Sequence, residues 1–185
     1  FGVEQGLSQS QVQTIEQDND GNLWIGTLSG LTKYNGRDFT TFSKKDGLAE
    51  DWITSSYKDK SGNLWFGHWA GGVSRYVYKT KKIENLNFEE YSRFKKITAI
   101  TQDSIGKFWI STEGAGIIIY EPEINKMSTL TKKDGIRTNN LYNICQDNKG
   151  NMWLASDSGI VIYDSNVSQG AQNSFTFIDK SKGLP

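Results

Sequence analysis

The chain has 185 residues, which is enough for one domain with a proper hydrophobic core. Lys and Arg together number 21, as do Asp and Glu, so the formal net charge is zero. A neutral chain argues against a nucleic-acid or anionic-membrane partner, because such partners normally bind a basic surface. The single cysteine excludes an internal disulfide, and no apolar run approaches the ~18 residues needed to cross a bilayer.

A ten-residue pattern occurs four times, and its first copy, from Asp18 to Thr27, reads DNDGNLWIGT. In each copy a Gly follows the Asp by three residues and a Trp follows it by six. A small residue lies two positions after each Trp, and the tryptophans are 41, 44 and 44 residues apart. Self-similarity at a fixed period indicates a repeat architecture. The repeat glycines and tryptophans are Gly21, Gly62, Gly106 and Gly150, with Trp24, Trp65, Trp109 and Trp153.

The first repeat predicts four short strands in chain order, at residues 12–17, 22–27, 31–35 and 38–43. Gly21 can take the positive φ that a tight turn between the first two strands requires. Asn35-Gly36 is a hairpin signal between the third and fourth strands. The DNDGN segment also suggests a calcium loop, but it lacks the later glutamate at the required spacing, so a turn is favoured.

Four antiparallel strands in a period of about 40–45 residues are typical of a β-propeller blade. The predicted fold is therefore all-β: one partial propeller domain over residues 1–185, with four blades of four antiparallel strands each. The expected blades cover residues 6–46, 47–90, 91–134 and 135–182. A lone blade cannot bury both faces, so we expect the Trp to fill the space between stacked blades. The small residue two positions later makes room for the next sheet.

The parts of the repeat found at the two ends of the sequence favour an arc of a larger propeller. Phe1 lies five residues before Gly6, as Phe42 lies five before Gly47, and the final SKGLP restates the KDGL that opens a repeat. An arc leaves an apolar blade face uncovered. We expect that face to be covered by the remaining propeller blades or by a second chain.

The stretch GLSQSQVQTIEQDNDGNLWIGTLSGLTKYNG resembles the two-component regulator propeller repeat, which occurs in periplasmic sensor regions of hybrid histidine kinases, especially in Bacteroidetes. The resemblance extends over all four repeats. Departures are His68-Trp69 where Thr is usual, Ser111 for the second Gly, and Tyr91-Ser92 for Gly-Leu. The resemblance implies a periplasmic or extracellular sensor, often of glycan fragments, that signals through the membrane to a kinase. It also implies a homodimeric receptor at full length.

One predicted face of the propeller gathers residues that differ between the repeats. In an up-and-down blade, the loops joining strands two and three share a face with the loops leading into each blade. Aromatic and polar side chains on these loops suit sugar stacking and hydroxyl binding. An oligosaccharide or other small molecule is the expected ligand. The candidate ligand-binding residues are Trp52, His68, Trp69, Glu113, Arg137, Asn139, Asn140 and Asp157.

Each candidate also has a purely structural interpretation. Trp52 and Trp69 are off the repeat, yet such residues pack more often than they bind ligands. His68, the single histidine, is typical of a residue that hydrogen-bonds within its loop, and loop carboxylates such as Glu113 and Asp157 are commonly solvated. Cys145 lies on a predicted inner strand, where we expect an inert core side chain.

Three functions fit this sequence, and a ligand-sensing propeller of a two-component receptor is favoured. The first alternative is a protein-interaction scaffold. The second is a lyase, since some lyases have similar DxxGxxW propellers. With one histidine and no Ser-His-Asp or metal-spaced cluster, we expect no catalytic residue, metal or cofactor in this segment. A histidine kinase would belong to the rest of a full-length protein.

Overall fold

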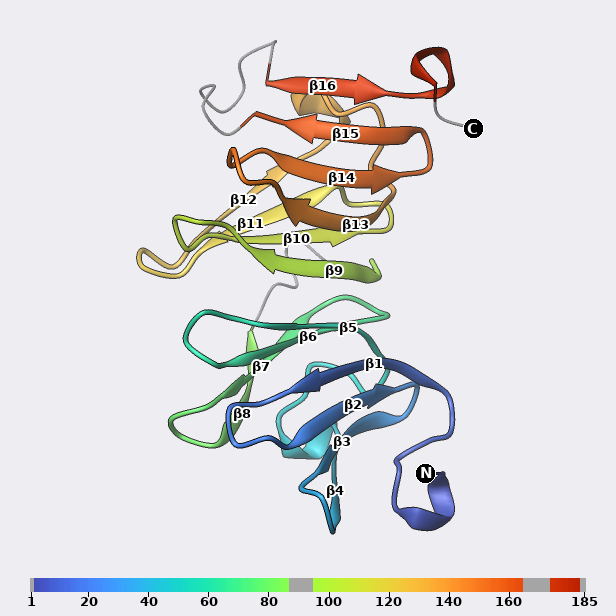
Figure 1. The fold of residues 1–185 in the computed structure, drawn as a ribbon, viewed down its shortest axis with the longest axis vertical. Helices are drawn as coiled ribbons and strands as arrows, with labels where there is room; N and C mark the ends of the chain where they lie inside the picture. Colours follow the sequence, from blue (N-terminus) through green and yellow to red (C-terminus); the bar gives the residue numbers. More distant parts are fainter. Residues whose placement is uncertain (1, 87–94, 165–173, 184–185) are drawn as a thin grey trace. The chain divides into compact units, whose positions relative to one another are not determined.

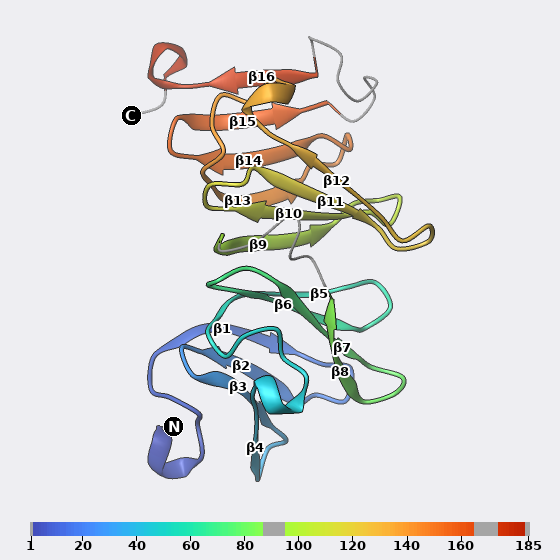
Figure 2. The ribbon, with the colours of Figure 1, turned by 180° about the vertical axis from the view of Figure 1, so that it is seen from behind.

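The computed structural model describes residues 2–86, 95–164 and 174–183. These residues form four four-stranded antiparallel sheets, in which strands that are consecutive in the chain pair with each other (Figure 1, Figure 2). The predicted all-β propeller with four blades is confirmed. Phe1, Tyr91-Ser92 and the last two residues of SKGLP lie outside the described residues.

Each sheet corresponds to one sequence repeat. Blade 1 has β1 (Val12–Gln17), β2 (Leu23–Thr27), β3 (Gly30–Tyr34) and β4 (Phe39–Phe42). Blade 2 has β5 (Ile53–Lys58), β6 (Leu64–His68), β7 (Val73–Val77) and β8 (Lys82–Leu86). Blade 3 has β9 (Ile97–Gln102), β10 (Phe108–Thr112), β11 (Ile117–Glu121) and β12 (Lys126–Leu130). Blade 4 has β13 (Leu141–Gln146), β14 (Met152–Ser156), β15 (Gly159–Tyr163) and β16 (Phe175–Ile178).

The chain divides into two compact units, Phe1–Ile97 and Thr98–Pro185. Unit 1 contains blades 1 and 2. Unit 2 contains blade 4 and all of blade 3 except Ile97. The organisation of residues 1–185 as one domain stays a prediction.

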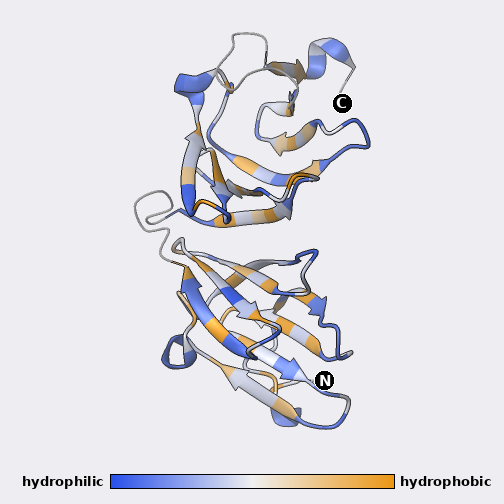
Figure 3. Cartoon of the chain, turned by 90° about the vertical axis from the view of Figure 1, so that its left-hand side faces the viewer, coloured by the Kyte–Doolittle hydropathy of each residue, from blue (hydrophilic) through white to orange (hydrophobic). Residues whose placement is uncertain are grey.

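Polar and apolar residues are mixed along the strands of the blades (Figure 3). Successive side chains of a strand point to opposite faces of its sheet. In blade 1, Trp24 pairs with Lys33 and Gly26 pairs with Leu31, so these residues share one face. Ile25, between them in the chain, lies on the opposite face. Each blade therefore presents a tryptophan face, which carries the repeat Trp, and an opposite receiving face.

Trp24 is the centre of the packing between blades 1 and 2. Its indole is fully buried, and its ring lies 4.3 Å from that of Tyr76 and 5.4 Å from that of Phe42. A Cβ added to Gly26 would lie 2.6 Å from Cγ2 of Ile53 in blade 2. The predicted roles of the Trp as filler and of the small residue as a spacer are both confirmed in unit 1.

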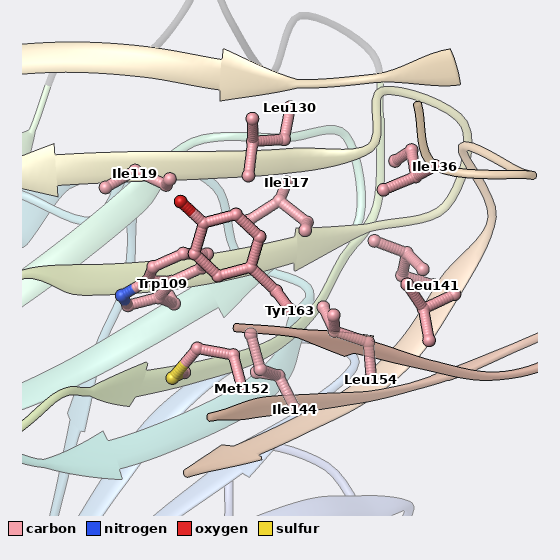
Figure 4. Close-up of a cluster of buried hydrophobic side chains, with 11 residues drawn as sticks. Trp109, Ile117, Ile119, Leu130, Ile136, Leu141, Ile144, Met152, Leu154 and Tyr163 are labelled. Atoms are coloured by element: carbon pink, nitrogen blue, oxygen red, sulfur yellow. The ribbon is translucent and has the colours of Figure 1, made fainter. Parts of the chain in front are cut away.

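Trp109 has the same position in unit 2. Its ring lies 5.2 Å from that of Tyr163 in blade 4, and only 4% of the residue is exposed. Figure 4 shows this cluster, in which the two rings lie side by side among aliphatic side chains of both blades. The tryptophan face of blade 3 thus packs on the receiving face of blade 4, as blade 1 packs on blade 2.

Short 3-10 turns occur next to the strands and were not predicted from the sequence. They are η1 (Val3–Gln5), η2 (Lys44–Asp46), η3 (Lys132–Asp134) and η4 (Lys180–Lys182). In η2, Ser43 N donates to Asp46 Oδ2 at 2.8 Å, and Gly47 ends the turn with φ +106°. The next residue, Leu48, is buried in the packing between blades 1 and 2. The recurrent Gly-Leu pair therefore ends a 3-10 turn and places an aliphatic side chain between blades.

An aspartate–tryptophan pair links the turn of each repeat to its buried indole. In blade 1, Trp24 Nε1 donates to Asp18 Oδ2 at 2.9 Å, while Asp18 Oδ1 accepts the backbone N–H groups of Asp20 and Asn22, each at 2.9 Å. The bond recurs at Asp59–Trp65 (2.8 Å), Asp103–Trp109 (2.9 Å) and Asp147–Trp153 (2.9 Å). One carboxylate thus holds the turn and satisfies a buried indole donor.

At Asp147 and Asp18 these bonds favour the charged form of the carboxyl group. The pKa of Asp147 falls to about 2, first because the Trp153 indole donates to its carboxylate and then because Asn151 does. Burial raises the pKa of Asp18, but the bonds from Trp24 and Asn22 outweigh burial, and the net direction is downward. Charged acceptors make the stronger hydrogen bonds, so these two aspartates stabilise the fold more as carboxylates than as neutral acids.

Asp18→Asn is expected to lower the free energy of unfolding by about 2 kcal/mol, because an amide NH₂ placed against the Trp24 indole leaves a buried donor unsatisfied. Chemical denaturation followed by tryptophan fluorescence measures the change. Asp38→Asn, at an exposed aspartate in the neighbouring hairpin, is the control and should be nearly neutral. Equal stability of the two variants would contradict the structural role of the pair.

Stability should also decrease at acid pH. Since the pKa of Asp147 is about 2 in the folded chain and 3.8 ordinarily, its contribution is complete above about pH 4 and is lost as the pH falls through 2. Carboxyl-carbon NMR titration should place the midpoint of Asp147 near pH 2. A midpoint near the ordinary value would show that the indole bond does not form in solution.

Candidate functional site

Trp52 and Trp69 form a stacked pair on the loops of blade 2. Trp52 precedes β5 and Trp69 follows β6, and the pairing of Ile53 with His68 brings these two strand ends together. The ring centroids are 4.3 Å apart with an interplanar angle of 9°. Trp69 N also donates to the Trp52 carbonyl at 3.0 Å, so the backbone fixes the pair. The two tryptophans that lie outside the repeat therefore form a single stacked pair on the loops of blade 2.

Charged groups lie beside this tryptophan pair. Trp69 is 43% exposed, and the Lys96 ammonium lies 5.0 Å from the centroid of its ring. The Glu50 carboxylate accepts a hydrogen bond from the backbone N–H of Ala70 at 2.9 Å. The surface of unit 1 around the tryptophan pair therefore presents the exposed Trp69 side chain, the Lys96 ammonium and the Glu50 carboxylate. Lys96 was not among the candidates, because the Lys95-Lys96 pair is also typical of a solvated strand edge.

His68 lies inside the blade rather than on this surface. The residue is fully buried, and its Nε2 lies 2.8 Å from the hydroxyl oxygen of Ser74. Burial lowers its pKa to about 3, so the imidazole is neutral at physiological pH. A side chain without exposed area does not contact a ligand on the rim, and the geometry supports the structural interpretation of His68.

The imidazole of His68 is expected to show no titration above pH 5, because the cost of burying its charge keeps the pKa near 3. Ring nitrogen NMR shifts of the single histidine would measure this without ambiguity. A midpoint between pH 6 and 7 would mean that water reaches the imidazole.

A second group of candidates meets in unit 2. Glu113 and Asn140 form an isolated β-bridge, and Asn140 Nδ2 donates to Asp157 Oδ2 at 2.9 Å. The hydrogen bonds from Asn140 and then from Thr138 lower the pKa of Asp157. Glu113 in the β10–β11 loop, Asn140 just before β13 and Asp157 in the β14–β15 loop therefore lie together on the loops of unit 2.

The remaining two candidates make contacts within the frame of unit 2. Asn139 Oδ1 accepts the Lys132 backbone N–H at 2.9 Å, and the Asn139 carbonyl accepts the N–H groups of Gly114 and Gly116 at 2.9 and 3.0 Å. Asn139 therefore ties η3 to the β10–β11 loop. Arg137 Nη1 lies 2.6 Å from Asp179 Oδ2, and the Arg137 guanidinium lies 4.3 Å from the ring centroid of Phe177.

The inner strand of blade 4 corrects one expectation. Cys145 is exposed, not a core residue, because it pairs with Trp153 and shares the tryptophan face of the blade. The core side chain is its neighbour Ile144. Tyr142 on the same strand is 49% exposed, and it was not among the candidate ligand-binding residues. Its signal in the sequence is an aromatic residue at the repeat position where two other repeats have Thr54 and Thr98.

The described residues bring no three His, Cys, Asp or Glu side chains together in a way that could hold a metal ion. Within residues 2–86, 95–164 and 174–183, no helix combines the length and apolar character that crossing a membrane requires.

The repeat is similar to segments of known proteins. The profile of the two-component regulator propeller family matches residues 6–29, 47–70 and 135–158, which belong to blades 1, 2 and 4. A curated relative, histidine kinase P4 of Formosa agariphila, is 54% identical over 37 residues, which are 20% of this chain and 3% of that protein.

Solved structures show the same fold at low sequence identity. The extracellular domain of a putative hybrid two-component system from B. thetaiotaomicron matches with a TM-score of 0.70 and 23% identity, over 89% of this chain and 24% of that one. Virginiamycin B lyase from Staphylococcus aureus matches with a TM-score of 0.68 and 12% identity, over 94% of this chain and 57% of the lyase. The chain thus spans about a quarter of the first and just over half of the second.

Proposed function

Because this chain carries the two-component regulator propeller repeat in blades 1, 2 and 4, we propose that it is a ligand-sensing segment of a receptor of the hybrid histidine kinase type. The short match to a histidine kinase and the fold shared with a two-component extracellular domain support this proposal. The segment would lie on the periplasmic or extracellular side of the inner membrane, in a receptor that is homodimeric at full length.

The ligand that we propose is a glycan or a similar small molecule, and the tryptophan pair is the observation that carries this proposal. The four repeat tryptophans are accounted for by packing and by their aspartates, whereas Trp52 and Trp69 stack with each other at the surface. Trp69, a residue that is 43% exposed, leaves apolar surface that a ligand could cover. The apolar face of a sugar ring matches a flat indole of this kind.

The neighbouring charges suit hydroxyl groups. Lys96 lies over Trp69 at 5.0 Å, a cation–π contact that is worth only about 0.5–1 kcal/mol at an exposed site. A ligand can displace this flexible side chain from the ring and then accept a hydrogen bond from its ammonium. Glu50, held through Ala70, offers a carboxylate that accepts from a hydroxyl. Binding would therefore combine stacking with two charge-assisted hydrogen bonds.

The alternatives have less support. A lyase would need an acid or base that reaches its substrate, and the single histidine is fully buried with a pKa of about 3. We therefore propose a segment without catalytic activity, despite the fold it shares with virginiamycin B lyase. A protein-interaction scaffold predicts association through blade faces and does not account for the exposed tryptophan pair.

Titration with a panel of oligosaccharides, followed by indole N–H NMR shifts, tests the proposal. A bound glycan should shift the Trp52 and Trp69 signals, and Trp69→Ala should weaken binding about tenfold, since one aromatic contact is worth up to about 1.5 kcal/mol. Ile105→Ala, at an exposed apolar residue in the turn of blade 3, should bind like the unchanged chain. Tight binding by Trp69→Ala would remove the pair from the site, and no shift with any glycan would exclude a sugar ligand.

A further inference from the structure

In blade 1 a hydroxyl network holds the entry loop, residues 8–11, which leads into β1. Thr27, the last residue of β2, is fully buried, and its Oγ1 lies 2.9 Å from the Ser8 Oγ. The Ser8 backbone N–H donates to Thr32 Oγ1 at 3.0 Å, and the Thr32 hydroxyl donates to the Ser8 Oγ at 3.0 Å. Three hydroxyl groups therefore join the start of this loop to β2 and β3.

Blade 2 changes two members of this network together. Ala49 has the repeat position of Ser8, and His68 has that of Thr27. Ser74 in β7 retains the hydroxyl that β3 supplies in blade 1. Ala49 offers no hydroxyl, and the longer imidazole reaches Ser74 directly, with Nε2 2.8 Å from Oγ. The Ala49 N–H still donates to the Ser74 Oγ at 2.8 Å, and a serine hydroxyl can accept this bond while it donates to the imidazole.

This network connects the backbones of both surface tryptophans to one buried hydroxyl. His68 is the last residue of β6, and Trp69 follows it directly in the chain. Ala49 begins the entry loop of blade 2, residues 49–52, and Trp52 ends it. Ser74 is fully buried and bonded to the imidazole on one side and to the Ala49 N–H on the other. The end of β6 and the start of the entry loop therefore have a common support beneath the stacked rings.

Other bonds hold the middle of the entry loop without His68. The Asp51 carbonyl accepts the Gly30 N–H of blade 1 at 2.8 Å, and Asp51 Oδ1 accepts the Lys44 N–H at 2.7 Å. The bond from Trp69 N to the Trp52 carbonyl fixes a distance between two backbones but not the angle between two rings. Loss of the imidazole should therefore leave blade 2 folded and loosen the stacking of its tryptophans.

We propose that His68, bonded to Ser74, is a positioning residue that fixes the stacked Trp52 and Trp69 rings for ligand binding without contacting the ligand. The proposal rests on the proposed function, in which this pair is the ligand surface. Fixed rings spare the ligand the cost of ordering two mobile side chains when it binds. Blades 1 and 3 have Thr27 and Thr112 at the position of His68, and neither has a tryptophan pair on its loops.

Ring-current NMR shifts test the positioning role without any ligand. The Trp52 ring protons should lie upfield because the Trp69 ring stacks on them at 4.3 Å, and Trp69→Leu should remove this shift and so assign it. His68→Thr should remove most of the shift, since threonine is too short to reach Ser74. His68→Thr combined with Ala49→Ser should restore the shift, because the pair rebuilds the serine–threonine arrangement of blade 1.

A control separates positioning from a general loss of buried bonds. Thr112→Val removes a buried hydroxyl at the equivalent position of blade 3 and should leave the Trp52 signals unchanged. Cooperative thermal unfolding should show that the variants fold. If His68→Thr does not fold, Ser74→Ala, which removes only the hydroxyl, should show the same loss of shift. Unchanged Trp52 signals in either folded variant, or a double variant that fails to restore them, would overturn the proposal.

Glycan titration separates this proposal from the proposed function. His68→Thr should bind an oligosaccharide of the panel roughly two- to tenfold more weakly, which is the cost of ordering a mobile side chain, and Ala49→Ser should recover most of the loss. A chain that binds no glycan but loses and regains the ring shifts as expected would overturn the proposed function and support the positioning of the pair. Unchanged glycan affinity in a folded His68→Thr variant would overturn its role in binding.

Discussion

The hydrogen bond from each repeat indole to the aspartate six residues earlier is the interaction on which the rest of the structure depends. A tryptophan ring is large enough to fill the space between two sheets, but its N–H group must be satisfied when it is buried there. Asp18 meets this need for Trp24 and also accepts two backbone donors of the adjacent turn. Turn geometry and packing between blades are therefore set by one carboxylate, which explains why Asp, Gly and Trp recur at fixed offsets.

Most of the fold was predictable because it depends on periodic sequence features. Strand positions, the hairpin at Asn35-Gly36 and the packing of Trp24 against the next blade all follow from spacing and residue size. Two features were not predictable in this way. The 3-10 turns depend on capping hydrogen bonds such as that between Ser43 and Asp46, which a search for hydrophobic periodicity does not detect. The exposure of Cys145 follows from its position on the tryptophan face opposite Trp153, and alternation counted from Leu141 misses this because the register shifts between Leu141 and Asn143.

The sequence predicted only which loops form the candidate surface. It did not predict the role of a single loop residue, because such a residue does not recur at the same position in the other repeats. Trp52 and Trp69 are distant in the sequence and meet through strand register, so their stacking required the structure. His68 shows the converse: its position beside Trp69 suggested a rim residue, and the pleat turned it inward to Ser74. The contacts between blades thus use residue types that recur at fixed positions of the repeat. The loops carry residues that differ from one repeat to the next.

Pairing of each strand with its neighbour in the chain also has a consequence for how the protein reaches its folded state. In every blade the meander brings together residues that are close in the sequence, so loop-closure entropy is small and contact order within a blade is low. A blade can begin to form during synthesis, before the sheet that will stack on it exists. Nascent blades would expose their indoles during that interval, which makes the delay between successive repeats the period of greatest risk for misfolding.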